Sequence, residues 1–413
     1  MEQKRFWAAA GKLLAATAAT LIIVSILAPG AWAVSEKVLH SFTGGDDGYE
    51  PHQGLAVDAV GNLYGTTFVG GAHGAGTVFK LTPNLDGTWT ESVLHDFTGR
   101  RDGGYVDWGT VAFDPKGNLY GAAYEGGNYG AGVLFRLTPN GDGTWAKSIV
   151  HQFTGGKDGG WPRTTPYFDA QGTLYGTAAY GGSHGCGTVF KIENGAKSVI
   201  HQFMDKPACS PWVGLTSDSV GNLYGTTRNA VGGCNPPNEC GTVFELTPAP
   251  NGKWTFEVIH RFVGGDDGSD PSVSGLIIDD AGNLYGTTEH AGPYDSGVLF
   301  SLTPGENQKW SYRVLHAFNN YSDGSCATGH LVRDPVGNIF GTACLGGAYG
   351  YGTVYKLTPN LDETWTFSVV YAFSGSDGAN PVGNLLLDEA GDLFGVTASG
   401  GSFGAGAVYE IVP

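Results

Sequence analysis

The 413-residue sequence lacks three features that would each indicate a different class of protein. From residue 34 onward it has no sustained 3.6-residue apolar period with capping residues, which excludes a helical fold. After residue 33 it has no apolar run long enough to cross a bilayer. Positive charge is scarce, since 22 Lys and Arg face 39 Asp and Glu, a formal net charge of −17. Such a surface repels phosphate, which argues against nucleic-acid binding and leaves cations and neutral polymers such as sugars as admissible partners.

The one long apolar run lies at the N-terminus. Lys4, Arg5 and Lys12 precede or open the run LLAATAATLIIVSIL, and Ala31-Trp32-Ala33 follows it, the layout of a secretory signal peptide. We expect residues 1–33 to be removed, which would change the net charge from −17 to −19 because three positive charges and one negative charge leave. An uncleaved anchor is the alternative, although about 15 apolar residues are short for a span. The mature chain, 34–413, should be extracytoplasmic (secreted, periplasmic or at the cell surface) and not embedded in the membrane.

The mature chain repeats one phrase seven times. VLHSFTGGDDGYEP at 38–51 returns as VIHRFVGGDDGSDP at 258–271, and successive copies are 50 to 59 residues apart. In V-x-H-x-F the histidine shares a strand face with Val and Phe, which favours a core role over proton transfer. A tryptophan that opens the same strand in five copies is also interpreted as packing. The recurring residues are His40, His95, His151, His201, His260, His316 and, in the last copy, Tyr371.

Each copy predicts four short strands. Residues 54–97 contain GLAVD, NLYGTT, GTVFKLT and WTESVLHDF, separated by segments rich in Gly, Pro, Asn and Asp. A single meander of about 55 residues cannot bury both faces of its sheet, so the copies must stack around a closed ring. The mature chain starts with one lone strand and ends with three. We therefore predict an all-β fold over residues 34–413: a seven-bladed β-propeller of four-stranded antiparallel blades, closed by pairing of the N-terminal strand with the last three strands.

Carboxylates recur in two kinds of turn. One aspartate per copy lies three residues before a glycine, which is the chemistry of a tight hairpin; these are Asp58, Asp114, Asp169, Asp218, Asp279, Asp334 and Asp388. The repeated phrase also contains Asp-Gly pairs, again typical of turns. Because GGDDGYEP and GGDDGSDP each place three carboxylates within a few residues, calcium is the alternative. Neither has the D-x-D-x-D-G spacing of a calcium loop, so a turn without any cofactor is the expected reading.

The repeated motifs together are specific. They are F-x-G-G-x-D-G-x-x-P, D-x-x-G-N-L-Y-G-T-T, G-G-x-x-G-x-G-T-V-F-x-L-T-P and W-T-x-x-V-L-H-x-F, and they cover essentially all of residues 34–413. In this combination the chain resembles the GloVer tandem-repeat proteins, a family of exported bacterial proteins. The resemblance implies an extracellular or surface location and an array of repeats. It supplies no established activity, so no catalytic residue can be carried over.

Function should be sought where the repeats differ from one another on a face that carries loops. Counting six residues back from each repeated aspartate predicts a ring around the channel mouth: His52, Trp108, Arg163, Trp212, Val273, Thr328 and Val382. Clustered Trp and Tyr suit stacking on sugar rings, and the alternative is that tryptophan merely plugs the channel. Repeats two to four gather the candidate ligand-binding residues on one side of this mouth, namely Tyr105, Trp108, Trp161, Arg163 and Trp212.

A second variable position lies in the glycine-rich loop of each repeat. His73 and His184 occupy it in repeats one and three, but the aligned residues elsewhere are aromatic. We therefore expect a packing role for these histidines rather than a catalytic one. The aligned residues are Tyr129, Tyr294, Tyr349 and Phe403.

The sequence favours recognition over catalysis. No Ser-His-Asp set or carboxylate pair stands out from the repeat pattern. We therefore expect an exported, non-catalytic recognition or scaffold propeller that binds a polysaccharide or another surface component on its loop-bearing face. The alternative is an extracytoplasmic lyase or hydrolase of carbohydrate whose site is formed by the loops of repeats two to four, since propeller active sites leave no contiguous motif.

Six cysteines, an even number in an exported chain, predict disulfides rather than metal binding or catalysis. Cys326 precedes the inner strand of repeat six, and Cys344 ends the partner strand. In that hairpin Asp334 should lie opposite Asn338, which places the two cysteines across the same hairpin within the separation of about 4.4–6.8 Å between Cα atoms that a disulfide needs. The sequence therefore assigns Cys326–Cys344.

The other four cysteines allow two arrangements. Cys209 and Cys234 flank the equivalent hairpin of repeat four, where Asp218 should lie opposite Asn222; this assigns Cys209–Cys234 and leaves Cys186 and Cys240 at equivalent positions in adjacent repeats. The alternative pairs Cys186 with Cys209 and Cys234 with Cys240.

Overall fold

The computed structural model describes residues 34–107, 109–204, 208–228, 240–271, 275–306 and 309–413. Residues 1–33, the expected signal peptide, lie outside the described part. Within that part no helix is long and apolar enough to cross a membrane. The described part includes a single turn of 3-10 helix, η1 (Gly265–Asp267).

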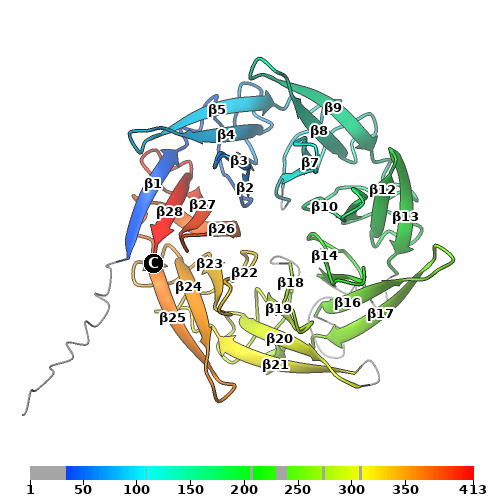
Figure 1. The fold of residues 1–413 in the computed structure, drawn as a ribbon, viewed down its shortest axis with the longest axis vertical. Helices are drawn as coiled ribbons and strands as arrows, with labels where there is room; N and C mark the ends of the chain where they lie inside the picture. The colour runs from blue at the N-terminus through cyan, green and yellow to red at the C-terminus, as the bar shows by residue number, and fades with distance from the viewer. Residues whose placement is uncertain (1–33, 108, 205–207, 229–239, 272–274, 307–308) are drawn as a thin grey trace, which may run out of the picture. The chain divides into compact units, whose positions relative to one another are not determined.

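The described residues form seven four-stranded antiparallel sheets arranged as a ring, which confirms the predicted β-propeller (Figure 1). Blade one consists of β2 (Ala56–Val57), β3 (Leu63–Thr66), β4 (Thr77–Pro83) and β5 (Trp89–Asp96). Blade two consists of β6 (Ala112–Phe113), β7 (Leu119–Ala123), β8 (Val133–Pro139) and β9 (Trp145–Gln152). Blade three consists of β10 (Tyr167–Phe168), β11 (Leu174–Ala178), β12 (Thr188–Glu193) and β13 (Ala196–Gln202). Blade four consists of β14 (Thr216–Ser217), β15 (Leu223–Thr227), β16 (Thr242–Pro248) and β17 (Trp254–Arg261). Blade five consists of β18 (Ile277–Ile278), β19 (Leu284–Thr287), β20 (Val298–Pro304) and β21 (Trp310–Ala317). Blade six consists of β22 (Val332–Arg333), β23 (Ile339–Ala343), β24 (Thr353–Pro359) and β25 (Trp365–Ala372). Blade seven consists of β26 (Ala379–Leu387), β27 (Leu393–Ser399), β28 (Ala407–Val412) and β1 (Ser35–Ser41).

The ring closes between the two ends of the chain. Strand β1 pairs antiparallel with β28, from Ser35 opposite Val412 to Ser41 opposite Ala407, and Figure 1 shows the two strands side by side in the seventh blade. The N-terminal strand therefore completes the last blade, as the strand count predicts, and β28 is not left as an open edge.

An aromatic pair links every blade to the next. The phenylalanine that ends the V-x-H-x-F motif is fully buried, as Phe42 illustrates, and its ring lies 5.1 Å from that of Phe79 in the next blade. The glycine of N-L-Y-G-T makes room for this core, because a Cβ on Gly65 would lie 2.4 Å from the Phe79 ring. Ring centroids are 4.9–5.4 Å apart at all seven junctions: Phe42–Phe79, Phe97–Phe135, Phe153–Phe190, Phe203–Phe244, Phe262–Phe300, Phe318–Tyr355 and Phe373–Tyr409.

The repeated aspartate before glycine stabilises the turn between the first two strands of each blade. Asp58 accepts hydrogen bonds from the backbone N–H groups of Val60 (3.0 Å) and Asn62 (2.9 Å). The other six aspartates accept the same pair of bonds. The turn reading of these carboxylates is therefore confirmed.

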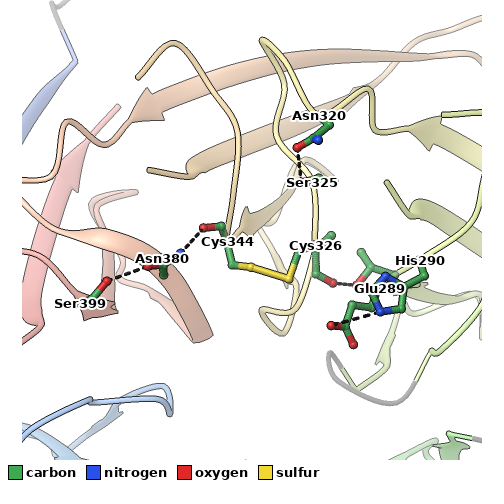
Figure 2. Close-up of a disulfide and its surroundings, with 10 residues drawn as sticks. Glu289, His290, Asn320, Ser325, Cys326, Cys344, Asn380 and Ser399 are labelled. Carbon is green, nitrogen blue, oxygen red and sulfur yellow. Dashed lines mark hydrogen bonds and ion pairs between the residues drawn. A yellow bond between two sulfur atoms is a disulfide. The ribbon is translucent and has the colours of Figure 1, made fainter. Parts of the chain in front are cut away.

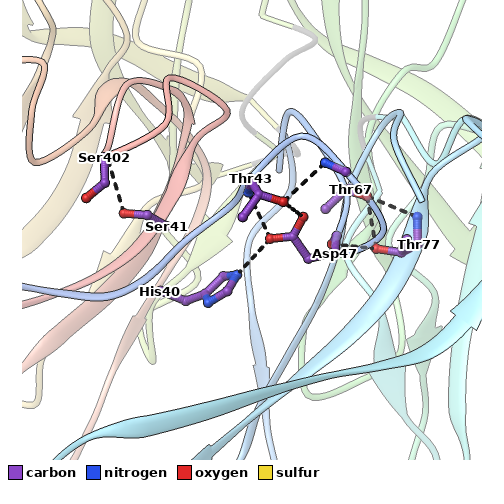
Figure 3. Close-up of polar contacts among 8 residues, drawn as sticks. His40, Ser41, Thr43, Asp47, Thr67, Thr77 and Ser402 are labelled. Atoms are coloured by element: carbon purple, nitrogen blue, oxygen red, sulfur yellow. Dashed lines mark hydrogen bonds and ion pairs between the residues drawn. The ribbon is translucent and has the colours of Figure 1, made fainter. Parts of the chain in front are cut away.

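The recurring histidine contacts the aspartate of the turn that follows its own strand. In the first copy His40 Nε2 lies 3.4 Å from Asp47, and Asp47 accepts a 2.8 Å bond from the N–H of Thr43 (Figure 3). Four other copies have the same His–Asp contact at 2.9–3.4 Å. In the seventh the hydroxyl of Tyr371 donates to Asp377 at 2.6 Å, which explains how tyrosine replaces histidine. Burial, with a smaller effect of nearby Lys147, lowers the pKa of His95 to about 4, as suits a neutral, packed ring.

Two disulfides lie in the described residues with both partners. The predicted Cys326–Cys344 bridge is confirmed, with 5.4 Å between the Cα atoms. It joins two loops of blade six, where the carbonyl of Cys344 also accepts a 3.0 Å bond from the side chain of Asn380 (Figure 2). Cys186 is bonded to Cys209, with 4.6 Å between the Cα atoms. The assignment Cys209–Cys234 is therefore wrong, and the first bridge of the alternative is correct. Cys240 is also disulfide-bonded, whereas Cys234 lies outside the described residues.

A difference of one residue in loop register explains this correction. Cys326 has a left-handed backbone conformation (φ 59°), as does Tyr105 of blade two (φ 54°). Cys209 comes one residue earlier in its loop, at the position of Gly104. A Cβ on Gly104 would lie 3.1 Å from the Cβ of Ala75, which belongs to the preceding blade. The Cys209 side chain therefore points to the preceding blade, toward Cys186, and not across its own hairpin.

Peptide mapping without reductant should recover one peptide pair joining Cys186 to Cys209 and another joining Cys326 to Cys344. These bridges close segments of 23 and 18 residues, and each should stabilise the fold by about 3 kcal/mol through loss of unfolded-chain entropy. Reduction should therefore lower the midpoint of denaturant unfolding. A peptide that joins Cys326 to Cys186 or Cys209 would contradict the blade assignment.

Candidate functional site

One face of the ring carries two loops from each blade. The loop that enters the innermost strand forms a bridge with the loop between the second and third strands of the same blade, for example Tyr49 with Val69 and Ser269 with His290. We call this side the loop face. The turns between the first and second strands and the hairpins between the third and fourth strands lie on the opposite side, the hairpin face.

At one equivalent position, each entering loop has a non-glycine residue in the left-handed conformation, with φ between 54° and 62°. In six of the seven loops its N–H donates to the preceding blade, as from Tyr105 to the carbonyl of Ala75 (2.8 Å) and from Asp270 to that of Cys240 (2.9 Å). Since the backbone makes these bonds, the side chain is free to vary between blades. The seven residues are Glu50, Tyr105, Trp161, Ser210, Asp270, Cys326 and Asn380.

The residue two positions later lies in the predicted ring around the channel mouth. In blade three this is Arg163, four residues before β10, but blades two and five each have one extra residue between the left-handed residue and the innermost strand. Counting six residues back from the repeated aspartate therefore misses the ring position by one residue in these two blades, and in blade two the ring residue is Asp107. Trp108, which the sequence placed in the ring, lies outside the described residues.

Charged and aromatic side chains from blades two to five form a continuous row on the loop face. Arg163 forms a 2.7 Å ion pair with Asp107, and the two side chains are 13% and 7% exposed. The guanidinium of Arg163 lies 4.1 Å from the ring centroid of Trp212, and that of Arg228 lies 4.0 Å from it. Arg228 in turn pairs with Asp270 at 3.1 Å. We call Asp107, Arg163, Trp212, Arg228 and Asp270 the loop-face row.

The row combines predicted and unpredicted residues. Arg163 and Trp212 were expected to lie together, and they do. Tyr105 and Trp161 belong to the same face; the Tyr105 ring packs 5.9 Å from Phe68 of the preceding blade, and the Trp161 ring packs 6.1 Å from Tyr180 of its own blade. Asp107, Arg228 and Asp270 were missed, and the signal that could have found them is an unmatched charge in an otherwise neutral loop position.

Three potential metal ligands meet at the end of the row. Ligand atoms of Asp270, Glu289 and His290 lie within 4.8 Å of one another, the one such group among the described residues. Asp270 already pairs with Arg228, and His290 Nε2 lies 3.5 Å from Glu289 (Figure 2). Burial raises the pKa of Glu289. The group is thus an ion-paired cluster that balances the charge of Arg228.

The variable position in the glycine-rich loops is exposed. Tyr129, Tyr294, Tyr349 and Phe403 are 63–65% exposed, and the side chain of His73 is 56% exposed. The packing role expected for this position is therefore wrong, since the rings point into solvent from a tight turn. We call the six described residues at this position the rim aromatics: His73, Tyr129, His184, Tyr294, Tyr349 and Phe403.

The turn that presents each rim aromatic is held rigidly. In blade one Gly74 N–H donates to the carbonyl of Gly71 at 3.1 Å, and both glycines have positive φ, 74° and 79°. The loop is also tied to the outer strand of its own blade, because His73 Nδ1 lies 2.9 Å from Asp96. In blade two the N–H of Asn128 donates to the Gln152 side chain at 2.7 Å. The rim aromatics are therefore exposed but fixed in place.

Comparison with solved structures supports the fold. The chain is similar to the extracellular domain of a candidate hybrid two-component system of B. thetaiotaomicron, with TM-score 0.54, 11% identity, and coverage of 90% of this chain and 39% of that one. It is also similar to a one-component counterpart from the same organism, with TM-score 0.50, 13% identity, and coverage of 91% and 40%. This chain thus spans about two fifths of both, and at such identity the likeness shows the fold alone.

In a third match, to another solved structure, the aligned region takes in the whole of the other chain. It is a candidate glucose dehydrogenase of Thermus thermophilus, with TM-score 0.44, 13% identity, and coverage of 92% of this chain and 100% of that one. No curated protein sequence matches this chain.

The sequence pattern of the Gloeobacter/Verrucomicrobia repeat matches three overlapping segments, residues 24–235, 86–273 and 232–413. Together they take in all seven blades, as expected from the resemblance to the GloVer proteins. The chain therefore belongs to the Gloeobacter/Verrucomicrobia repeat family.

Proposed function

We propose that this propeller is an extracytoplasmic, non-catalytic recognition module that binds a polysaccharide through the rim aromatics of its loop face. The disulfides support a location outside the cytoplasm, because such bonds persist in oxidising compartments. The formal charge of −17 suits a neutral partner better than an anionic polymer.

The exposure of the rim aromatics carries the proposal. The residue type changes between His, Tyr and Phe from blade to blade, yet a flat ring is present in all six blades where the position is described. Rings that are more than half exposed contribute little to the buried core, so folding does not account for them. A flat ring held in a rigid turn suits stacking on the apolar face of a sugar.

Their repetition around the ring favours a polymer over a single sugar. One stacked ring binds weakly, but neighbouring sites on one rigid scaffold raise the effective concentration for the next sugar unit of the same chain. A long polysaccharide could thus be retained although each contact is weak.

The loop-face row fits a structural role beneath this surface. Two guanidinium groups lie over the Trp212 ring, 4.1 and 4.0 Å from its centroid, so a sugar would have to displace an arginine to stack there. In the proposal Arg163 and Trp212 fix the loops of blades two to four relative to one another, whereas Tyr105 and Trp161, both half-buried, border the bound polymer.

The proposal predicts loss of polysaccharide retention when the rim aromatics are removed. The variant Tyr129→Ala, Tyr294→Ala, Tyr349→Ala, Phe403→Ala should bind the best polymer from a glycan array at least about 100-fold more weakly, because avidity is lost with the individual contacts. Affinity electrophoresis with that polymer measures the change. Leu85→Ala, Leu361→Ala is the matched control, since both leucines are fully exposed in the hairpins of the opposite face.

Equal retention by the rim variant and the control would contradict the proposal, as would failure of the unmodified protein to bind any polymer. Turnover of the retained polymer would instead favour the lyase or hydrolase with a site in the loops of blades two to four.

A further inference from the structure

A hollow of about 600 Å³ opens between blades two and three on the hairpin face. Blade two contributes Tyr120, Arg136 and Ser148 to its wall, and blade three contributes Gln171 and Asn194. This volume lies within the range of about 300–1,000 Å³ typical of small-molecule sites. The hollow is on the side of the propeller opposite the rim aromatics, so it is independent of the proposed polysaccharide site.

A hollow of similar volume lies between blades one and two, but Trp145 lines that one; the short outer hairpin of blade three leaves the hollow between blades two and three without a tryptophan. In blades one, two, four, five and six the last strand opens with a tryptophan, and at four junctions this ring packs on a tyrosine of the preceding blade, as Trp145 packs on Tyr64 (5.8 Å). In blade three, β12 ends at Glu193 and β13 begins at Ala196. The connection is the two-residue turn Asn194-Gly195, with φ values of 52° and 79°. No tryptophan is therefore available to cover Tyr120.

Arg136 is left without a partner at this junction. It projects from β8 between Tyr120 and Ser148 on the neighbouring strands. Its Nε is buried and has no hydrogen-bond partner. Within the described part of the chain the Arg136 side chain makes neither a hydrogen bond nor an ion pair. A buried, unpaired donor on a charged group is unfavourable, so the site is incomplete as it stands.

The equivalent side chains in other blades are satisfied. Glu245 of blade four accepts a 3.2 Å bond from the hydroxyl of Tyr224, and Lys191 of blade three pairs with Glu193 at 2.7 Å. In blade one the ammonium of Lys80 lies 5.8 Å from the Tyr64 ring. Arg136 thus differs from its counterparts in both its surroundings and its lack of a partner.

Among the described residues, the hydroxyl of Tyr120 has no hydrogen-bond partner either. In four other blades the equivalent tyrosine donates to the repeated aspartate at 2.9–3.3 Å. Asp114, the aspartate of blade two, accepts from the side chain of Asn118 at 2.7 Å and from two backbone N–H groups, and Tyr120 makes no such bond. The hollow therefore combines an unpaired guanidinium with an unpaired hydroxyl.

We propose that this hollow binds a small ligand carrying an oxyanion, with the group seated on the guanidinium of Arg136. The planar fork of arginine matches a carboxylate or a sulfate, and such charge-assisted bonds are the strong ones. The hydroxyl of Tyr120 and the side chains of Gln171 and Asn194 are placed to bind hydroxyl groups of the same ligand. Lys116 adds a second positive charge to the wall, whereas the carboxylate of Asp114 is occupied by its own turn. A sugar acid satisfies both requirements.

Calorimetric titration of the purified protein with galacturonate, and separately with sulfate, tests the proposal. The unmodified protein should show saturable binding, and Arg136→Gln should weaken it at least about tenfold, because a hydrogen bond to a charged group is lost. Tyr120→Phe should cause a smaller loss. Lys80→Gln is the matched control, since Lys80 occupies the equivalent strand position at a junction that has its tryptophan.

Binding of galacturonate alone identifies a carboxylate site, and binding of both probes identifies a general oxyanion site; both support the proposal. If neither galacturonate nor sulfate binds saturably, the proposal is overturned. Equal affinity of Arg136→Gln and the unmodified protein also overturns it, provided that the unfolding temperature of the variant is unchanged.

Discussion

Deletion of residues 34–44, which include β1, is expected to lower the unfolding temperature by at least about 10 °C. The segment buries Leu39 (8% exposed) and Phe42 (fully buried) against the first blade and completes the seventh sheet. Without it the ring of Phe79 loses its partner, and β28 becomes an unpaired edge. Loss of a buried aromatic and a buried aliphatic side chain, together with a row of backbone hydrogen bonds, accounts for the size of the effect. Differential scanning calorimetry measures it.

Two controls separate closure from a simple loss of chain. Ser35→Ala, Lys37→Ala leaves β1 in place and should melt close to the unmodified protein, because neither residue is buried. A synthetic peptide of residues 34–44, added to the deleted protein, should restore most of the lost stability. An unchanged melting temperature on deletion would mean that β1 does not close the ring.

The fold could be predicted because every repeat has to meet the same packing requirement against the next blade. The Phe42 position needs an aromatic partner in the next blade, and Gly65 has to be a glycine beside the Phe79 ring. Because the requirement is the same at every junction, the same residue types recur in every repeat. Strand number and the pairing of β1 with β28 follow from counting strands, which is insensitive to errors of one or two residues at strand ends.

The site was harder to predict because loops do not tolerate an error of one residue. Cys209 was assigned to its own blade, although a position one residue from that of Cys326 faces the preceding blade. Asp107 was displaced from the ring by one extra residue in blade two, so its partnership with Arg163 could not be seen. Side-chain direction depends on local register, which the repeat pattern fixes for strands but not for loops of different length.

The exposure of the rim aromatics could not be predicted from the sequence either. An aromatic position such as Tyr129 is compatible with a core and with a binding surface, and only the path of the glycine-rich loop decides between them. Arg228 shows a further limit, since it reaches Trp212 from a different loop and no local spacing joins the two.

Breaking the buried ion pair of the loop-face row should be the most destabilising single substitution on that face. Arg163→Ala removes the 2.7 Å partner of Asp107 (7% exposed), leaving this carboxylate a 3.9 Å contact with the His52 ring, and it removes one of the two guanidinium groups over Trp212. Loss of one member of a buried pair typically costs about 3–5 kcal/mol of the free energy of unfolding, because the remaining charge is desolvated and unpaired. Denaturant unfolding at neutral pH measures the change.

The pair can be told apart from general damage to the loops by a double-mutant cycle. Asp107→Ala, Arg163→Ala should be less destabilised than the sum of its two single variants, since neither buried charge is then left alone. Lys191→Ala is the matched control. Its 2.7 Å pair with Glu193 has side chains 28% and 54% exposed, and an exposed pair contributes only about 0–1 kcal/mol. Strict additivity of the two single substitutions would show that Asp107 and Arg163 stabilise the loop face independently, and the loop-face row would then not be a connected unit.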